Sequence, residues 1–160
     1  MARRNEHLVV AMLEPIEIGK EFIDWPLHIT LAPWFPCDDE NKLDKILSEI
    51  AGRHSGFGVE VGGIEDFGGK NPVPVNVIVE NDNLSKLHRD IINGLEASGF
   101  SIHQKEYIGE GYRPHVTHQK HARKSQGEQI KIESFGLAKQ IRLKKIGTMV
   151  KTLVKNYELG

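Results

Sequence analysis

The sequence predicts an α+β domain built on a largely antiparallel sheet. Three observations predict this class: segments with strand patterns outnumber those with helical patterns, two segments repeat apolar residues at helical spacing, and the connections are short. Length and composition agree, because 160 residues suffice for one domain with its own core, and 39% hydrophobic with 27% charged residues is usual for a globular protein. We therefore expect residues 1–160 to form a single domain.

The first part of the chain predicts two strands and a helix. Leu8 to Leu13 is a short apolar run typical of a buried strand, and residues 27–32 alternate in the way of a second strand. Residues 37–40, with their three acidic side chains, supply the N-cap and first turn of a helix. The apolar face of this helix consists of Leu43, Ile46, Leu47 and Ile50.

A similar group follows. Alternating apolar residues predict strands over residues 57–61 and 73–79, and Pro72 and Pro74 indicate that the latter begins at a sheet edge. A second helix begins at Asn81 and ends at Gly99, which serves as its C-cap. The apolar face of this helix consists of Leu84, Leu87, Ile91 and Leu95.

The C-terminal part predicts strands only. Residues 129–157 are rich in β-branched residues and form two or three alternating groups: Ile130/Ile132, Ile141/Leu143 and Val150/Thr152/Val154. The order is therefore ββαββαββββ, with neighbours that can pair as hairpins. Each half of the chain offers strands, one helix and one His-x-Thr tripeptide, which suggests an approximate internal symmetry.

The charge distribution bears on possible partners. Residues 1–99 carry 9 Lys+Arg and 17 Asp+Glu, whereas residues 100–160 carry 12 and 5, so the net charge of −1 hides a basic C-terminal part. That part could hold an anionic ligand such as a phosphate or a short nucleic acid, or its lysines could simply solvate outward faces. The small net charge argues against tight, non-specific binding to a nucleic-acid duplex.

Other classes are excluded by the absence of their patterns. A single cysteine, Cys37, excludes a disulfide framework and a multi-cysteine zinc site, and we expect its thiol to be inert. No apolar run approaches the ~20 residues of a membrane span. The basic N-terminus leads into a short apolar run that stops at Glu14, which argues against a secretory signal. We expect a cytoplasmic monomer with no membrane partner.

Two tripeptides are the best candidates for chemistry: His28-Ile29-Thr30 and His115-Val116-Thr117. The chain has only four threonines, and two of them follow a histidine by two residues. The β-branched central residue of each tripeptide favours a strand, on which the histidine and the threonine share one face. One such tripeptide alone is more typical of a half-buried strand histidine that binds a backbone carbonyl, but two together favour a functional pair.

Two such strands side by side would suit phosphoester chemistry. A neutral imidazole can take a proton from water or a hydroxyl, and a protonated one can give a proton to the leaving oxygen. The unperturbed histidine pKa near 6.5 lets both forms coexist near neutral pH. Threonine hydroxyls can donate hydrogen bonds to the non-bridging phosphate oxygens. This scheme requires no metal ion and no other cofactor.

The two motifs, Leu27-His28-Ile29-Thr30-Leu31 and Pro114-His115-Val116-Thr117, resemble the paired His-x-Thr-x motifs of the 2H phosphoesterase superfamily. The sequence is most similar to the LigT-like group of RNA 2′,3′-cyclic phosphodiesterases, historically named 2′-5′ RNA ligases. Chain length and the placement of both motifs also fit this group. The resemblance implies a bilobed phosphoesterase domain with two mainly antiparallel sheets, helices outside and a central cleft.

The resemblance also implies residue roles and a substrate. His28 and His115 would be the catalytic acid/base pair, with His115 as the base and His28 as the acid by motif position. Thr30 and Thr117 would bind the phosphate. The implied reaction is hydrolysis of a cyclic phosphodiester in RNA processing, in which the 2′,3′-cyclic phosphate of an RNA 3′ end or a nucleotide opens to a 2′-phosphate.

The sequence departs from the family pattern in ways that bear on the substrate. His118 follows the second motif where an apolar residue is usual, and Lys120 or Arg123 would replace an arginine often found there. Residues 32–36 replace the commoner Phe-Leu-Gly continuation of the first motif. Another cyclic phosphate, such as ADP-ribose 1″,2″-cyclic phosphate, therefore stays open, as does a non-catalytic RNA- or nucleotide-binding module.

A metal-dependent hydrolase is a third hypothesis for the function. His115, His118 and His121 would gather a zinc ion if they lay on a helix. Positions i and i+3 of a strand face opposite ways, and Pro114 and the β-branched residues favour a strand. We therefore expect His118 to point away from the cleft and His121 to lie in the following loop, with no metal bound.

Several further side chains near the motifs have two interpretations each. Trp34, Phe35 and Tyr112 could stack on a base or could be ordinary core and rim aromatics. Arg113 could contact a substrate phosphate or be solvated. We expect the histidines without partnered spacing to be structural or to lie on the surface: His7, His54, His88 and His103.

Overall fold

The computed structural model describes residues 5–142 and 149–160 of the chain. Its strands are β1 (Asn5–Met12), β2 (Glu21–Phe22), β3 (His28–Cys37), β4 (Phe57–Phe67), β5 (Val73–Ile78), β6 (His115–Thr117), β7 (Gln129–Ile132), β8 (Ser134–Arg142) and β9 (Met149–Glu158). Its helices are α1 (Glu40–Gly52) and α2 (Asp82–Ala97), with 3-10 turns η1 (Lys105–Tyr107) and η2 (Gly109–Gly111). The predicted order is confirmed, and β2 and the two 3-10 turns are additions. Leu143, part of one predicted strand, lies outside the described residues.

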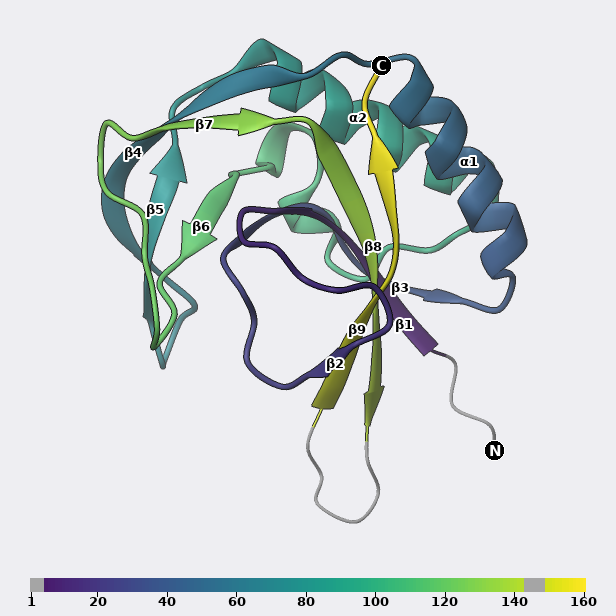
Figure 1. Cartoon of the computed structure of the whole chain (residues 1–160), viewed down its shortest axis with the longest axis horizontal. Helices are drawn as coiled ribbons and strands as arrows, with labels where there is room; N and C mark the ends of the chain where they lie inside the picture. The colour runs from purple at the N-terminus through teal and green to yellow at the C-terminus, as the bar shows by residue number, and fades with distance from the viewer. Residues whose placement is uncertain (1–4, 143–148) are drawn as a thin grey trace.

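The strands form one curled sheet in the order β2-β9-β8-β1-β3-β6-β5-β4-β7 (Figure 1). Every recorded pairing is antiparallel. The first half-sheet, β2 to β3 in that order, meets the second half-sheet, β6 to β7, where Ile29 of β3 pairs with Val116 of β6. The predicted α+β class with mainly antiparallel sheets is confirmed, and the two sheets are continuous through this pair.

The two helices lie side by side over one face of the sheet (Figure 1). Asp39 and Asn81 are their N-caps, and each side chain accepts a backbone N–H from the first turn. A Cβ at Gly94 of α2 would lie 2.9 Å from the Cδ1 of Ile50 in α1, so this glycine permits the close approach. Neither helix of the described chain has the length and apolar character to cross a membrane.

The core lies between the helices and the sheet. Ile29 and Val116, the central residues of the two tripeptides, are both 0% exposed, as the alternation predicts. The helix residues predicted to face the core are also buried, apart from the partly buried Ile46: Leu43, Leu47, Ile50, Leu84, Leu87, Ile91 and Leu95. The other face of β3 and β6 is therefore the one that carries the polar side chains of the tripeptides.

The expectation that β5 begins at a sheet edge is wrong. β5 lies inside the sheet, between β6 and β4. Pro72 precedes the strand and Pro74 stands near its start, where a missing N–H costs little. The carbonyl oxygen of Pro74 still accepts the His118 N–H at 3.0 Å. The prolines thus mark the end of pairing with the short strand β6 rather than a free edge.

A buried histidine ties α2 to β3. His88 is 1% exposed, its Nδ1–H donates to the Leu31 carbonyl oxygen at 2.7 Å, and its Nε2 accepts the Gly109 N–H at 3.0 Å. The ring of Tyr112 stacks on it at 3.7 Å. Both nitrogens of the neutral ring are used, and burial lowers the pKa of His88. His88 therefore fixes the loop before the second motif against the strand of the first.

Replacing His88 with leucine is expected to lower the free energy of unfolding by about 2–4 kcal/mol, because the carbonyl oxygen of the buried Leu31 and the Gly109 N–H lose their partner. Urea unfolding near neutral pH measures the change. The matched control is His103→Leu, which removes an exposed histidine paired with Glu6 at 3.0 Å and is expected to cost less than about 1 kcal/mol. Equal losses in the two variants would contradict the role of His88.

The same histidine predicts a pH dependence of stability. The pKa of His88 is lowered in the folded state, so the unfolded chain binds more protons than the folded one once the pH falls below the ordinary value of 6.5. Stability is then full above that pH and lost as the pH falls. The loss should be smaller in His88→Leu, as urea midpoints at several pH values would show.

Candidate active site

The register of β3 and β6 places the polar side chains of both tripeptides on one face. Because the central residues pair in an antiparallel ladder, His28 lies across from Thr117 and His115 lies across from Thr30. The histidines thus occupy one diagonal of a four-residue square, and the threonines occupy the other. All four are partly exposed. Diagonal neighbours in such a ladder are about 7–8 Å apart, which leaves room for one phosphate group between the imidazoles.

Both histidines are oriented by the same hydrogen bond. The Nδ1 of His28 is 2.9 Å from the Pro26 carbonyl oxygen, and the Nδ1 of His115 is 2.9 Å from the Arg113 carbonyl oxygen. A carbonyl oxygen only accepts, so Nδ1 carries a proton in both rings. Nε2 is therefore the nitrogen that can take up or release a proton in each ring.

Each imidazole also packs against an aromatic ring. The Trp25 ring lies 4.3 Å from the His28 ring, and the Phe67 ring lies 4.6 Å from the His115 ring, both measured between centroids. Trp25 lies in the segment that leads into β3, while Phe67 ends β4. The two histidines thus have matching supports, one from each half-sheet.

Burial lowers the pKa of both histidines. For His28 burial is the largest cause, the Pro26 carbonyl opposes it, and the positive charges of His115 and Lys151 lower the pKa further. For His115 burial again comes first, its carbonyl partner opposes it, and Arg113 lowers the pKa further. Both rings therefore favour the neutral form, with a lone pair on Nε2.

A cavity of about 550 Å³ opens beside Thr30 and His115. Four aromatic side chains contribute to its lining: Trp34, Phe67, Tyr107 and Tyr112. Trp34 and Tyr112 therefore lie at the cavity, in keeping with the first of their two interpretations, in which they stack on a base. Phe35 is 0% exposed, so it is an ordinary core aromatic residue and does not stack on a base.

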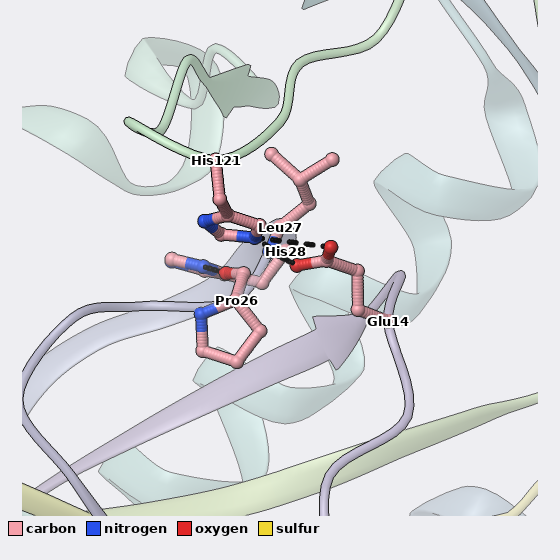
Figure 2. Close-up of polar contacts among 5 residues, drawn as sticks. All are labelled: Glu14, Pro26, Leu27, His28 and His121. Carbon is pink, nitrogen blue, oxygen red and sulfur yellow. Dashed lines mark hydrogen bonds and ion pairs between the residues drawn. The ribbon is translucent and has the colours of Figure 1, made fainter.

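The two ends of the β3–β6 pair are tied by side chains. At one end, the Tyr112 hydroxyl donates to the Thr30 carbonyl oxygen at 2.7 Å. At the other end, Glu14 accepts the Leu27 N–H at 2.6 Å, and its two carboxylate oxygens lie 2.9 and 3.0 Å from the Nε2 of His121 (Figure 2). Glu14 therefore joins the first residue of the first motif to the chain just after the second motif.

The charge of Glu14 is stabilised by these partners. Burial raises the pKa of this carboxyl group, but the hydrogen bonds from His121 and from the Leu27 N–H outweigh it, so the pKa is lowered overall. The carboxylate is the form that can accept both hydrogen bonds. Glu14 is therefore ionised at neutral pH, in the form that accepts from both the Leu27 N–H and His121.

Comparison with known proteins identifies the family of this chain. The model of the 2′-5′ RNA ligase superfamily matches residues 7–144. The chain belongs to the 2′-5′ RNA ligase superfamily, whose members are 2H phosphoesterases. A search of curated proteins gives no match.

Solved structures show that this superfamily member has the LigT-like fold. TT0787 of Thermus thermophilus is 17% identical with a TM-score of 0.65, over 96% of this chain and 97% of that one. E. coli LigT complexed with 3′-AMP is 18% identical with a TM-score of 0.64, over 98% and 99%. A structure described as a phosphoesterase is 18% identical with a TM-score of 0.63, over 98% and 99%.

The three histidines of the zinc alternative do not converge in the structure. His118 Nε2 lies 2.6 Å from the Oδ1 of Asn76, whose backbone pairs with the buried Val116, so His118 faces away from the tripeptide face. His121 contacts Glu14 from the loop after β6. Within residues 5–142 and 149–160, no group of three or more histidine, cysteine, aspartate or glutamate side chains could hold a metal ion.

The remaining candidate residues have structural partners or lie on the surface. A guanidinium nitrogen of Arg113 lies 2.9 Å from both carboxylate oxygens of Glu65. Lys120 and Arg123 are exposed, and burial raises the pKa of the Cys37 thiol, which disfavours the reactive thiolate. Three histidines without partnered spacing contact carboxylates, as expected of structural residues: His7 with Glu40, His54 with Asp90 and His103 with Glu6.

Sequence reasoning missed several residues around the histidines. These residues are Trp25, Phe67, Tyr107 and Lys151, and only the strand order brings Phe67 and Lys151 to the site. Trp25 alone offered a signal, because it lies three residues before His28. Glu14 offered none, since its place at the end of a strand is typical of a solvated carboxylate.

Replacing Glu14 with alanine is expected to lower the free energy of unfolding by about 1–3 kcal/mol, because the N–H of the buried Leu27 loses its acceptor. Glu14→Gln retains an oxygen that can accept this N–H and loses only the charge, so its loss should be smaller. Urea unfolding of both variants at neutral pH gives the comparison. If the two losses are equal, the ion pair with His121 and not the Leu27 bond stabilises this end.

Proposed function

We propose that the protein is a cyclic phosphodiesterase that opens the 2′,3′-cyclic phosphate of an RNA 3′ end or a nucleotide to a 2′-phosphate. The observation that carries this proposal is the square of two imidazoles and two hydroxyls on one face of the β3–β6 pair. Membership of the 2H phosphoesterases supports the reaction class. The related LigT structure with 3′-AMP supports a nucleotide as the ligand.

In the proposed reaction, the two threonines bind the phosphate and the two histidines move the protons. Thr30 and Thr117 donate hydrogen bonds to non-bridging oxygens. Neutral His115 takes a proton on Nε2 from water, whose oxygen attacks phosphorus as the bond to the 3′-oxygen breaks. Protonated His28 gives its Nε2 proton to that 3′-oxygen, so the phosphate stays on the 2′-oxygen. The motif positions support these roles, and no metal ion is needed.

The aromatic cavity supports a nucleoside on the side of Thr30 and His115. Its volume of about 550 Å³ falls within the roughly 300–1,000 Å³ of small-molecule sites. Bases stack on aromatic rings with little regard to sequence, which suits an enzyme that acts on many RNA ends. A phosphate at the square would thus have its nucleoside among Trp34, Tyr107 and Tyr112.

We also propose that residues 1–160 act as one two-lobed domain and as a monomer. One hydrophobic cluster contains buried residues from both half-sheets and both helices, which supports a shared core. A cytoplasmic location stays a prediction from the sequence.

Activity on a 2′,3′-cyclic nucleotide and on a short RNA with a 2′,3′-cyclic end tests the proposal. In excess EDTA we expect turnover to a 2′-phosphate, and His28→Ala or His115→Ala should each lower kcat by roughly 10²–10⁴-fold. Thr30→Val or Thr117→Val should cost less, on the order of tenfold, because each removes one hydrogen bond. His103→Ala is the control, since this exposed histidine contacts Glu6 away from the square.

Three outcomes would contradict the proposal. Turnover that survives both histidine variants would exclude the two-histidine mechanism. Loss of turnover in EDTA, restored by a divalent metal, would exclude a metal-independent reaction. A folded protein that binds 3′-AMP in a salt-sensitive way without turning over either substrate would be a binding module or would act on another cyclic phosphate.

The pH profile gives an independent prediction. Activity needs one neutral and one protonated histidine, so kcat/KM should be bell-shaped. Because burial lowers both pKa values below 6.5, both limbs should move to lower pH, and kcat/KM should fall as the pH rises above about 6.5. Rates at substrate concentrations well below KM, from about pH 4.5 to 8.5, measure the profile. An optimum above pH 7.5 would contradict it.

A further inference from the structure

The aromatic ring beside each histidine also contacts a cation. The Lys151 Nζ lies 5.6 Å from the centroid of the Trp25 ring that packs on His28. The Arg113 Cζ lies 5.1 Å from the centroid of the Phe67 ring that packs on His115. These separations are within the usual range for cation–π contact. Neither cation belongs to the two motifs themselves.

The two cations differ in their surroundings. The Arg113 side chain is 58% exposed and is paired with Glu65, so solvent and a carboxylate offset its charge. Lys151 is only 9% exposed, and its Nζ donates to the Ile23 carbonyl oxygen at 2.5 Å. Burial lowers the pKa of Lys151, while Asp24 opposes this effect. The charge of Lys151 is therefore the less screened of the two.

Lys151 also anchors the segment that carries Trp25. Its strand, β9, pairs with β2 through Phe22 and Lys151 itself, and the Phe22 ring packs edge-on against Trp25 at 5.2 Å. The bond to the Ile23 carbonyl fixes the chain two residues before Trp25. Lys151 thus pairs with β2, contacts the Trp25 ring and binds the segment that leads into β3.

We propose that Lys151 is a positioning residue of the active site, which holds Trp25 against His28 and keeps a positive charge near that imidazole until an anionic phosphate binds. The bound anion offsets this charge, so His28 takes up its proton together with the substrate. The inference rests on the proposed function in giving His28 a role in proton transfer.

Other charged groups also lie near His28 or near Lys151. His115 on β6 adds a positive charge when protonated. Glu14 binds the N–H of the preceding Leu27, and Asp24 acts on Lys151 from the same segment. A test of Lys151 must therefore change its charge and leave these groups in place.

The experiment follows the His28 ring by proton–carbon NMR as the pH is varied. Removing the charge with Lys151→Met should raise the pKa of His28 by roughly 0.3–1 unit, the size expected for one nearby charge at a partly solvated site. Lys151→Arg keeps the charge and should leave the pKa within about 0.2 unit of the wild type. The matched control is Lys155→Met, which removes a β9 lysine that lies 5.4 Å from the Tyr157 ring and pairs with Asp44.

Sulfate serves as the anion probe, because it does not titrate near neutral pH. In the wild type, saturating sulfate should raise the pKa of His28, because the bound anion offsets the positive charge of Lys151. If a folded Lys151→Met protein has the same His28 pKa as the wild type, both without sulfate and with it, the proposal is overturned.

Trp25→Phe tests the positional part and leaves the bond from Lys151 to Ile23 in place. It should lower kcat severalfold with little change in KM, because the ring beside His28 becomes smaller. An unchanged kcat would overturn the role of Trp25 in this contact. The NMR readout needs no turnover, so a shifted His28 pKa without activity would reject the proposed function alone. Turnover with an unshifted pKa would reject the inference alone.

Discussion

The pairing of Ile29 with Val116 is the contact on which the candidate active site depends. Within the described residues it joins the two half-sheets, and it sets which side chains of the two motifs face each other. Because side chains alternate along a strand, a slip of one residue would turn a motif's histidine and threonine into the core. Both paired residues are fully buried, so the hydrophobic core opposes such a slip. The geometry of the square is thus a consequence of packing on the opposite face.

A single pair of residues is a weak connection between the two half-sheets, and side-chain hydrogen bonds reinforce this connection at both of its ends. Tyr112 binds the Thr30 carbonyl at one end, and Glu14 holds Leu27 and His121 at the other. Each hydrogen bond contributes only about 1 kcal/mol, but together they restrict rotation of one motif relative to the other. Neither tie uses a side chain of the square. The two ties therefore fix the backbone of the motifs without using the Nε2 atoms of the imidazoles or the threonine hydroxyls.

The sequence was sufficient to predict that each motif places its histidine and threonine on one face, but not which side chains surround them. Alternation and β-branching give the face of each side chain, because they depend on local backbone geometry. They say nothing about which strands become neighbours, so Phe67 and Lys151 could not be placed beside the histidines. His88 did carry a signal, since it lies one turn after Leu84 on the apolar face of its helix. The edge predicted for β5 was wrong because β5 lies between β6 and β4, and the three-residue strand β6 ends where the prolines begin, so the sheet does not need an N–H from Pro74 on that side.

The two motifs form similar halves of the site, and the differences between these halves bear on the roles of the two histidines. Both histidines have the same Nδ1 bond and the same kind of aromatic contact, so the backbone alone would give them the same proton affinity. General acid–base catalysis needs two groups in different protonation states during one turnover. The differences come from the neighbours: a buried lysine on the side of His28, a paired arginine and the open cavity on the side of His115. In the proposed reaction, such unequal surroundings are what would allow two equivalent motifs to take opposite roles.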